Sequence, residues 1–308
     1  MKFKYKAYIP SLDQHIPITE LKTKDYLTVV KTVMNKQEDL TLAVFEDIIN
    51  TTVPVEFIPK LTRIDKFFIL CTVRALCVGS VLTLNFEDKE SKKPYTSYVH
   101  LMKILQDLAD VEVPLYKVIE DQRIKVTMSI PTELNTIDED SLIVDCIKQL
   151  EMNGNDINLS SFTTQERESI IQNLPVSVLD ELRTFVSTLM DQYKDVVLFK
   201  TLNPHERGAK PDVYKFNLFN NIMYSFLTTI WSDNINNIYE MFYILAKRVK
   251  ISIETLHEHT YAEVRMYLDM YEQELKRQEE ARKAEQNKTQ GREPQPIGNP
   301  AAAPMFES

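Results

Sequence analysis

The first residues of the chain alternate between polar and apolar side chains. Lysines stand at the even positions from Lys2 to Lys6, and apolar residues stand at the odd positions from Phe3 to Ile9. A period of two residues is that of a β-strand, whose successive side chains point to opposite faces of a sheet. The pattern predicts a strand over residues 2–9, with lysines that face solvent and protect an exposed edge.

Three segments that follow repeat their apolar residues three or four positions apart, as one face of a helix requires. They span residues 22–35, 38–50 and 63–77. The third segment is apolar on nearly every side, and such a helix is typical of the centre of a core. Thr62 stands where an N-terminal cap is expected, and Gly79 stands where a helix commonly ends.

Strand patterns come next, at residues 81–86, 111–119 and 124–130. Together with the first strand, we expect them to form one small antiparallel sheet packed on the early helices. The sequence therefore predicts an α+β protein that is mainly helical. The small antiparallel sheet packs on helices in the N-terminal half, and the C-terminal half is helical.

The C-terminal half begins with helical patterns at residues 141–152, 164–173 and 176–192. Beyond them, pairs of large apolar residues recur four positions apart over residues 217–249, with a break at Asp233–Asn234. A further helix is expected from residue 261, first with an apolar face and then, over 272–286, with charged pairs typical of a solvated helix.

Composition divides the chain into four parts. We expect an α+β domain at 1–135, a helical continuation at 136–202 and a helical C-terminal region at 213–286. The polar segment Asn203–Asp212, which contains prolines and a glycine, marks the boundary before the third part. Residues 287–308 carry four prolines among small residues, which predicts a disordered tail.

Net charge and glycine content narrow the function classes. The formal net charge of −9 opposes binding to the phosphate backbone of nucleic acids. The five glycines are too scattered to build a phosphate-binding loop, which excludes the usual nucleotide-binding folds. No window is long and apolar enough for a membrane span, and the charged start does not resemble a signal peptide, so we expect a cytosolic protein.

The candidate chemical groups do not form a recognisable active site. The three cysteines lie among apolar residues, which predicts free, buried and unreactive thiols. His257 and His259 would not share a helix face, and no third ligand is spaced for a metal. The acidic run Asp138–Asp140 precedes a helix, where it stabilises the helix start. We therefore expect no enzyme activity, no metal and no cofactor.

The segment Leu61–Gly79 resembles the signature of the T-even-type bacteriophage baseplate hub assembly protein family. Members of this family carry Ile-Asp, an apolar run, an arginine, and a small or polar pair before Val-Gly. The matching residues are Ile64, Asp65, Arg74, Val78 and Gly79, while Cys77 stands where a serine is more usual. Similar segments on either side extend the resemblance over residues 1–200.

Some relatives carry paired cysteines after this Val-Gly, which suggests a small metal ribbon. This chain has Glu87–Lys93 at that place, so no metal site is carried over. Arg74 and Gly79 leave two interpretations open. They contact a partner, or Arg74 fixes the core beside a carboxylate and Gly79 ends the helix.

The resemblance implies a protein of the contractile tail that acts in the host cytoplasm during virion assembly. It would be a non-enzymatic chaperone or scaffold for baseplate hub or tape-measure components. The alternative is a permanent structural subunit of the hub, present in the virion baseplate. Neither function requires nucleic acid, a membrane or a cofactor.

Such a function needs an apolar surface that a partner can cover. The helices of 217–249 and the helix from 261 are the candidates, although these helices could instead pack against each other. The residues selected for partner contact are Phe226, Ile230, Trp231, Phe242 and Tyr243.

Overall fold

The computed structural model describes residues 5–88, 91–112, 114–134, 139–194, 197–201, 203–204, 211–215, 219 and 221–290. Helices and small antiparallel sheets make up this part of the chain, with the sheets mainly in the N-terminal half, which confirms the α+β prediction.

Helix α3 (Arg63–Val78) lies at the centre of the body, as its pattern predicts. Its side chains are buried on all sides from Arg63 to Arg74. The elements that pack against it come from neighbouring and from distant parts of the chain: β1 (Tyr5–Ile9), α2 (Glu38–Thr52), α4 (Leu101–Ala109), α8 (Asn221–Trp231) and α11 (Tyr261–Gln290).

The ends of α3 follow from local chemistry. At its start, the side chain of Thr62 accepts a hydrogen bond from the backbone N–H of Asp65, and the carboxylate of Asp65 accepts one from the N–H of Thr62. This reciprocal pair satisfies two backbone groups that the first turn leaves open. At its end, Gly79 has a φ of 114°, which side chains with a Cβ rarely adopt.

The strands form four separate sheets, so the prediction of one sheet is wrong. Three of the sheets are hairpins, each made of two strands that follow each other along the chain. Of these hairpin strands, β1 packs against α3. In each hairpin the two strands pair antiparallel. The hairpins are β1 with β2 (Gln14–Ile18), β3 (Val81–Glu87) with β4 (Pro94–His100), and β9 (Val197–Thr201) with β10 (Asp212–Lys215).

The fourth sheet has four strands and corrects two further predictions. The expected strand at 111–119 begins only at Tyr116, and the expected helix at 141–152 ends at Cys146. Residues Ile147–Met152 are a strand because β6 offers them a partner along its free edge. The strands, in order across the sheet, are β5 (Tyr116–Asp121), β6 (Ile124–Ser129), β7 (Ile147–Met152) and β8 (Asn155–Ile157).

The hairpins β3–β4 and β9–β10 pack against each other through aromatic rings. Phe86 lies 6.4 Å from Phe199 and 5.7 Å from Tyr214, measured between ring centroids. Near the end of β3, the side chain of Asn203 donates a hydrogen bond of 2.5 Å to the buried carboxylate of Asp88. This polar contact joins the two hairpins.

Most of the remaining helices agree in position with the sequence patterns, but the helix that ends at Cys146 is shorter than expected and the helix Ile253–Glu258 has no predicted counterpart. Helix α1 (Thr23–Met34) precedes α2, and three helices lie beside the four-stranded sheet: α5 (Glu139–Cys146), α6 (Thr164–Gln172) and α7 (Val176–Lys194). The apolar doublets form α8 and α9 (Ile235–Ile244), with the predicted break between them. A π-helical turn (Leu245–Val249), α10 (Ile253–Glu258) and α11 follow. Of the tail expected at 287–308, the last eighteen residues lie outside the described part.

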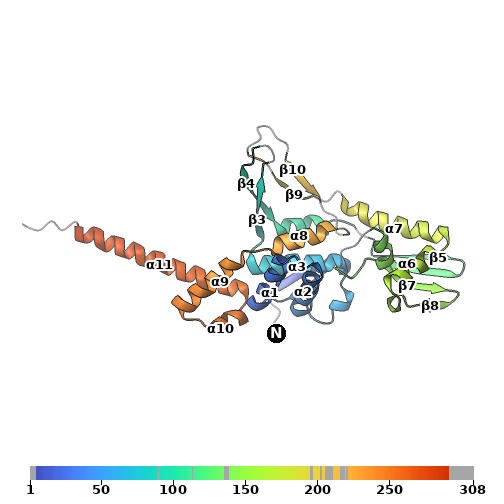
Figure 1. The fold of residues 1–308 in the computed structure, drawn as a ribbon, viewed down its shortest axis with the longest axis horizontal. Coiled ribbons are helices and arrows are strands. Elements are labelled where there is room, and N and C mark those ends of the chain that lie inside the picture. The colour runs from blue at the N-terminus through green and yellow to red at the C-terminus, as the bar shows by residue number, and fades with distance from the viewer. Residues whose placement is uncertain are drawn as a thin grey trace, which may run out of the picture.

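Figure 1 shows how these parts are arranged: the four-stranded sheet with α6 and α7 lies at one end of the helical body. The hairpins β3–β4 and β9–β10 rise from its middle, and α11 extends from the opposite end. None of the helices in the described ranges combines the length and the apolar character that a bilayer crossing requires.

Candidate interaction surface

A groove of about 660 Å³ lies between α1, α9, the π-helical turn and α10. Its floor is formed by the buried side chains of Leu27 and Phe242. Its rim carries apolar side chains that remain open to solvent: Tyr239 is 46% exposed, Tyr243 is 59% exposed and Ile253 is 46% exposed. Large apolar groups left exposed together are typical of surfaces that bind another molecule.

The geometry of α9 explains why one helix contributes to both the floor and the rim. Ile238, Met241 and Phe242 lie on its buried face, which packs into the body. Tyr239 and Tyr243 are four positions apart and therefore share the adjacent, exposed face. The amide oxygen of Asn234 accepts a hydrogen bond from the N–H of Asn236 and fixes the start of the helix.

Three lysines surround the apolar rim: Lys24 and Lys31 on α1, and Lys247 on the π-helical turn. The ammonium group of Lys31 lies 5.6 Å from the ring centroid of Tyr239, and that of Lys247 lies 4.9 Å from the ring centroid of Tyr243. Both distances allow a cation–π attraction. None of the residues that line the groove is acidic, although the chain as a whole has an excess of carboxylates.

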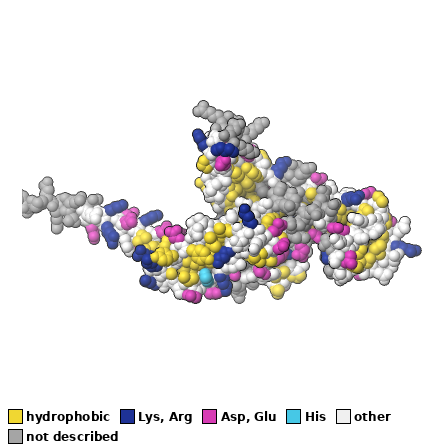
Figure 2. All heavy atoms as spheres, viewed as in Figure 1, with side chains coloured by type: hydrophobic (Ala, Val, Ile, Leu, Met, Phe, Trp, Pro, Cys, Tyr) yellow, Lys and Arg dark blue, Asp and Glu magenta, His cyan; other side chains and the backbone are white. Residues whose placement is uncertain are grey.

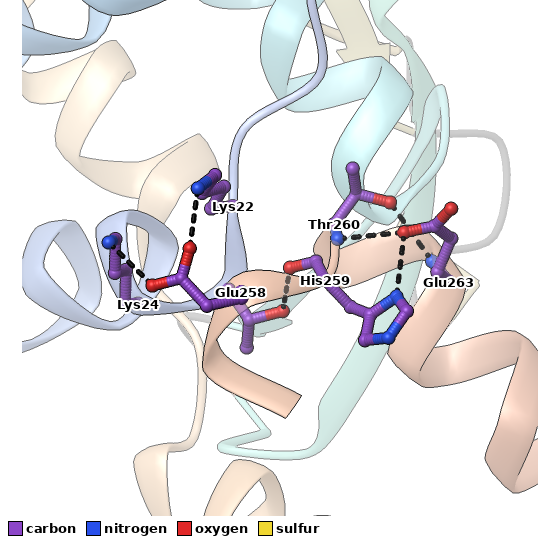
Figure 3. A network of polar contacts seen from close by, with 7 residues as sticks. Lys22, Lys24, Glu258, His259, Thr260 and Glu263 are labelled. Atoms are coloured by element: carbon purple, nitrogen blue, oxygen red, sulfur yellow. Dashed lines mark hydrogen bonds and ion pairs between the residues drawn. The ribbon is translucent and has the colours of Figure 1, made fainter. Parts of the chain in front are cut away.

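The corner between α10 and α11 is fixed to α1 by the polar network of Figure 3. Glu258 accepts hydrogen bonds from Lys22 at 2.5 Å and from Lys24 at 2.8 Å. These two bonds lower the pKa of Glu258 to about 2. The backbone carbonyl of His259 accepts bonds from the N–H and the hydroxyl of Thr23, both at 2.9 Å. The network therefore holds the α10 wall of the groove against the α1 wall.

The same corner positions the histidines that the sequence singled out. His257 lines the groove, where its ring lies 5.4 Å from that of Phe242. His259 points into the network of Figure 3, with Nδ1 3.2 Å from the carboxylate of Glu263. Within the described ranges, no group of three or more histidine, cysteine or acidic side chains is placed to hold a metal ion.

Figure 2 shows this region on the surface of the whole molecule. Hydrophobic side chains gather over the part of the body that Figure 1 labels α9, and both basic and acidic side chains border them. A histidine is visible beside the hydrophobic group. The view shows a continuous apolar patch rather than single scattered residues.

Of the five residues selected for partner contact, four are buried and one is exposed. The four buried residues lie on the faces of α8 and α9 that pack against the body, where α8 contacts α1 and α3 and α9 contacts α1. Each is at most 7% exposed: Phe226, Ile230, Trp231 and Phe242. These four side chains pack within the chain, which is the alternative that the sequence left open. Of the five, Phe242 and Tyr243 line the groove, and partner contact stays a prediction for these two.

The sequence did not indicate the α1 side of the groove or the lysines. Tyr239, Tyr243 and Lys247 follow each other at steps of four, and that spacing was the available signal for an exposed stripe. Lys24 and Lys31 carry no comparable signal, because their place beside α9 depends on a contact between opposite ends of the chain.

The family signature lies on α3, away from the groove, where its residues join α3 to other elements. Ile64 is buried in the core. The carboxylate of Asp65 also accepts bonds from the N–H and hydroxyl of Ser11, at 3.0 and 2.5 Å. The carbonyl of Val78 accepts a bond of 2.7 Å from Arg265 on α11, and Gly79 ends the helix.

Arg74 is the buried cation of this signature. Its Nε donates a hydrogen bond to the backbone carbonyl of Ile230, at the end of α8. Burial lowers its pKa, and the negative charge of nearby Asp233 opposes that change. The side chain therefore connects α3 to α8 through a carbonyl, with a carboxylate close by.

The thiols of Cys71, Cys77 and Cys146 are all buried and free. Burial raises the pKa of all three, to about 12 for Cys77, so they stay protonated at neutral pH. A protonated, buried thiol is a poor nucleophile.

A second, more polar hollow of about 480 Å³ lies between β7, β8 and the segment after β6. Its lining mixes acidic and basic side chains, and Gln149 donates a hydrogen bond of 2.7 Å to Asp156 within it. This mixture gives no single charge preference and no arrangement of nucleophile, base and orienting group.

Comparison with known proteins identifies the family. The chain belongs to the family described as T4 bacteriophage base plate protein, whose model matches residues 1–198. This match confirms the resemblance that the segment Leu61–Gly79 indicated. No curated protein and no solved structure matches the chain.

Proposed function

We propose that this baseplate-family protein is a non-enzymatic assembly protein that binds another tail protein, a baseplate hub or tape-measure component, through the α1–α9–α10 groove. The observation that carries the proposal is the exposed apolar rim of Tyr239, Tyr243 and Ile253 above an apolar floor. A baseplate protein works by contact with other phage proteins, and this groove offers the apolar surface that such contact needs.

The choice between an assembly factor and a permanent subunit depends on where the protein is found. An assembly factor is present in the infected cytoplasm and absent from finished particles. A permanent hub subunit is present in every particle at a fixed ratio. Both kinds of protein would use the groove. The protein composition of the finished particle, and not the shape of the surface, therefore distinguishes an assembly factor from a permanent subunit.

The test is a pull-down of the tagged, full-length protein from infected cells, with mass spectrometry of the eluate and of purified virions. Hub or tape-measure proteins in the eluate, with this chain missing from virions, are the expected result. Detection in virions at a fixed ratio would replace the assembly factor with a structural subunit. Absence of tail proteins from the eluate and of this chain from virions would contradict both functions.

A further inference from the structure

We infer that the groove binds an acidic amphipathic α-helix of its partner tail protein. This inference rests on the proposed function, and it specifies the chemistry of the bound segment. Three features of the groove support it: the secondary structure of its walls, the spacing of its apolar groups and the sign of its charge.

The walls of the groove decide between a helical and an extended occupant. They are built from α1, α9, the π-helical turn and α10, whose backbone groups are bonded within their own helical turns. No strand contributes to the lining, so an extended peptide would find no free strand edge to complete its backbone hydrogen bonds. A helix satisfies its own backbone and needs only side-chain contact.

The apolar positions match what a helix presents. Leu27, Phe242 and Ala246 form the inner part of the groove, and Tyr243 and Ile253 stand at its rim. Apolar side chains three or four positions apart on one helix face would fill such a groove from a single segment.

The charge around the groove selects an acidic segment. Lys31 and Lys247 have no carboxylate within ion-pair distance among the described residues, and each lies over a tyrosine ring at the rim. Lys24 shares Glu258 with Lys22. Lys31 and Lys247 are therefore the two lining cations without a carboxylate of the described chain beside them, and acidic side chains of a bound segment would gain attraction at these two places.

The experiment uses a photo-crosslinking amino acid in place of Tyr243 in the full-length protein, expressed in infected cells. Mass spectrometry then maps the segment that is crosslinked. The expected segment belongs to another tail protein, has apolar residues three or four positions apart, and carries an excess of Asp and Glu. A basic, proline-containing or extended segment would overturn the inference, as would a crosslink to a second copy of this chain or to its own C-terminal residues.

Charge reversal provides the second arm. The double variant Lys31→Glu and Lys247→Glu should lower the crosslink yield by on the order of tenfold, because two attractive rim contacts become repulsive. The matched control reverses Lys276 and Lys283, which are exposed on α11 outside the groove. Equal yields from both double variants would contradict the acidic helix.

The two arms also separate this inference from the proposed function. If the unaltered protein captures no tail protein at all, the proposed function fails. If it captures a tail protein whose crosslinks do not respond to the charge of the groove, the function stands and the acidic helix is wrong. Circular dichroism confirms that each variant keeps its helices.

Discussion

At the scale of single residues, Asp65 joins two parts of the chain that are distant in sequence. Its carboxylate completes the capping box with Thr62 and also holds Ser11 of the turn between β1 and β2. Asp65 is fully buried, so water cannot replace these bonds if the carboxylate is removed. The presence of Ile-Asp in the family signature therefore has a structural explanation: the aspartate starts the central helix and positions the first hairpin on it.

Replacement Asp65→Ala should lower the free energy of unfolding by about 3 kcal/mol, since it removes a helix cap and charged hydrogen bonds in a buried site. Urea denaturation measures this change. The control is Glu166→Ala, which breaks the corresponding capping box of α6 at the surface and should cost about 1 kcal/mol or less. A similar loss in both variants would show that the hydrogen bonds from Ser11 to Asp65 contribute nothing to the free energy of unfolding.

The ion pairs of Glu258 predict that the stability of the α10–α11 corner, which holds the walls of the groove together, depends on pH. Its pKa in the folded chain, about 2, lies below the usual value because Lys22 and Lys24 bond to the carboxylate. Because the pKa is depressed, the bonds from Lys22 and Lys24 to Glu258 stabilise the fold fully above the usual glutamate pKa of about 4.3. This stabilisation is lost as the pH falls towards 2, where the carboxylate becomes protonated.

An NMR titration of the Glu258 carboxyl should therefore give a midpoint far below that of an ordinary glutamate. Between pH 4.5 and 2, hydrogen exchange at the α10–α11 corner should rise. In Glu258→Gln the corner should exchange faster at neutral pH and show a weaker response to acid. A titration of Glu258 with an ordinary midpoint would mean that its lysine contacts are absent in solution.

At the scale of elements, periodic patterns predicted the helices well and the sheet pairings poorly. The apolar faces of α1, α2 and α3 repeat within one segment, so a single stretch of sequence contains the whole signal. The strand Ile147–Met152 directly follows a helix, and its state depends on the free edge of β6, which lies outside the segment itself. Helix α4 has four buried residues at helical spacing, so its signal is contained in one segment, although the predicted elements do not include it.

The contact between the two hairpins gives a prediction at this scale. Asp88→Ala removes the bond from Asn203 and should lower the exchange protection of β9 by about tenfold, with little effect on α3. Hydrogen exchange with mass spectrometry measures both regions in one sample. Thr96→Ala, which removes a bond of 3.2 Å within the exposed β3–β4 hairpin, is the control. Unchanged protection of β9 in Asp88→Ala would leave the aromatic rings as the main contact.

At the scale of the whole molecule, the groove exists only after the two ends of the described chain have come together. Lys24 and Lys31 belong to the first helix, whereas Tyr243 and His257 lie more than 200 positions further on. The periodicity of 217–249 predicted a helix with an apolar face but could not decide between Phe242 and Tyr243. These neighbours are about 100° apart around the helix, and the docking of α9 on α1 decides which one is covered.

The substitution Tyr243→Glu tests whether the groove of the folded protein binds tail proteins. The change places a charge at an exposed position, so the melting temperature should stay the same while recovery of tail proteins in the pull-down falls by about tenfold. Tyr98→Glu is the matched control, because Tyr98 is 67% exposed on β4, away from the groove. Equal recovery with both variants would remove the groove from the proposed function.

Helix α11 fixes both the distance and the direction from the body of the protein to the end of the helix. Its thirty residues correspond to a rod of about 45 Å, and the side chains from Glu272 to Gln286 are exposed and contribute little to the core. The end of α11 therefore lies remote from the groove, at the tip of an arm that Figure 1 shows projecting from the body. Because each turn of a helix adds about 5.4 Å, insertion or deletion of whole turns in α11 would change the distance between the body and the end of this arm in steps of that size.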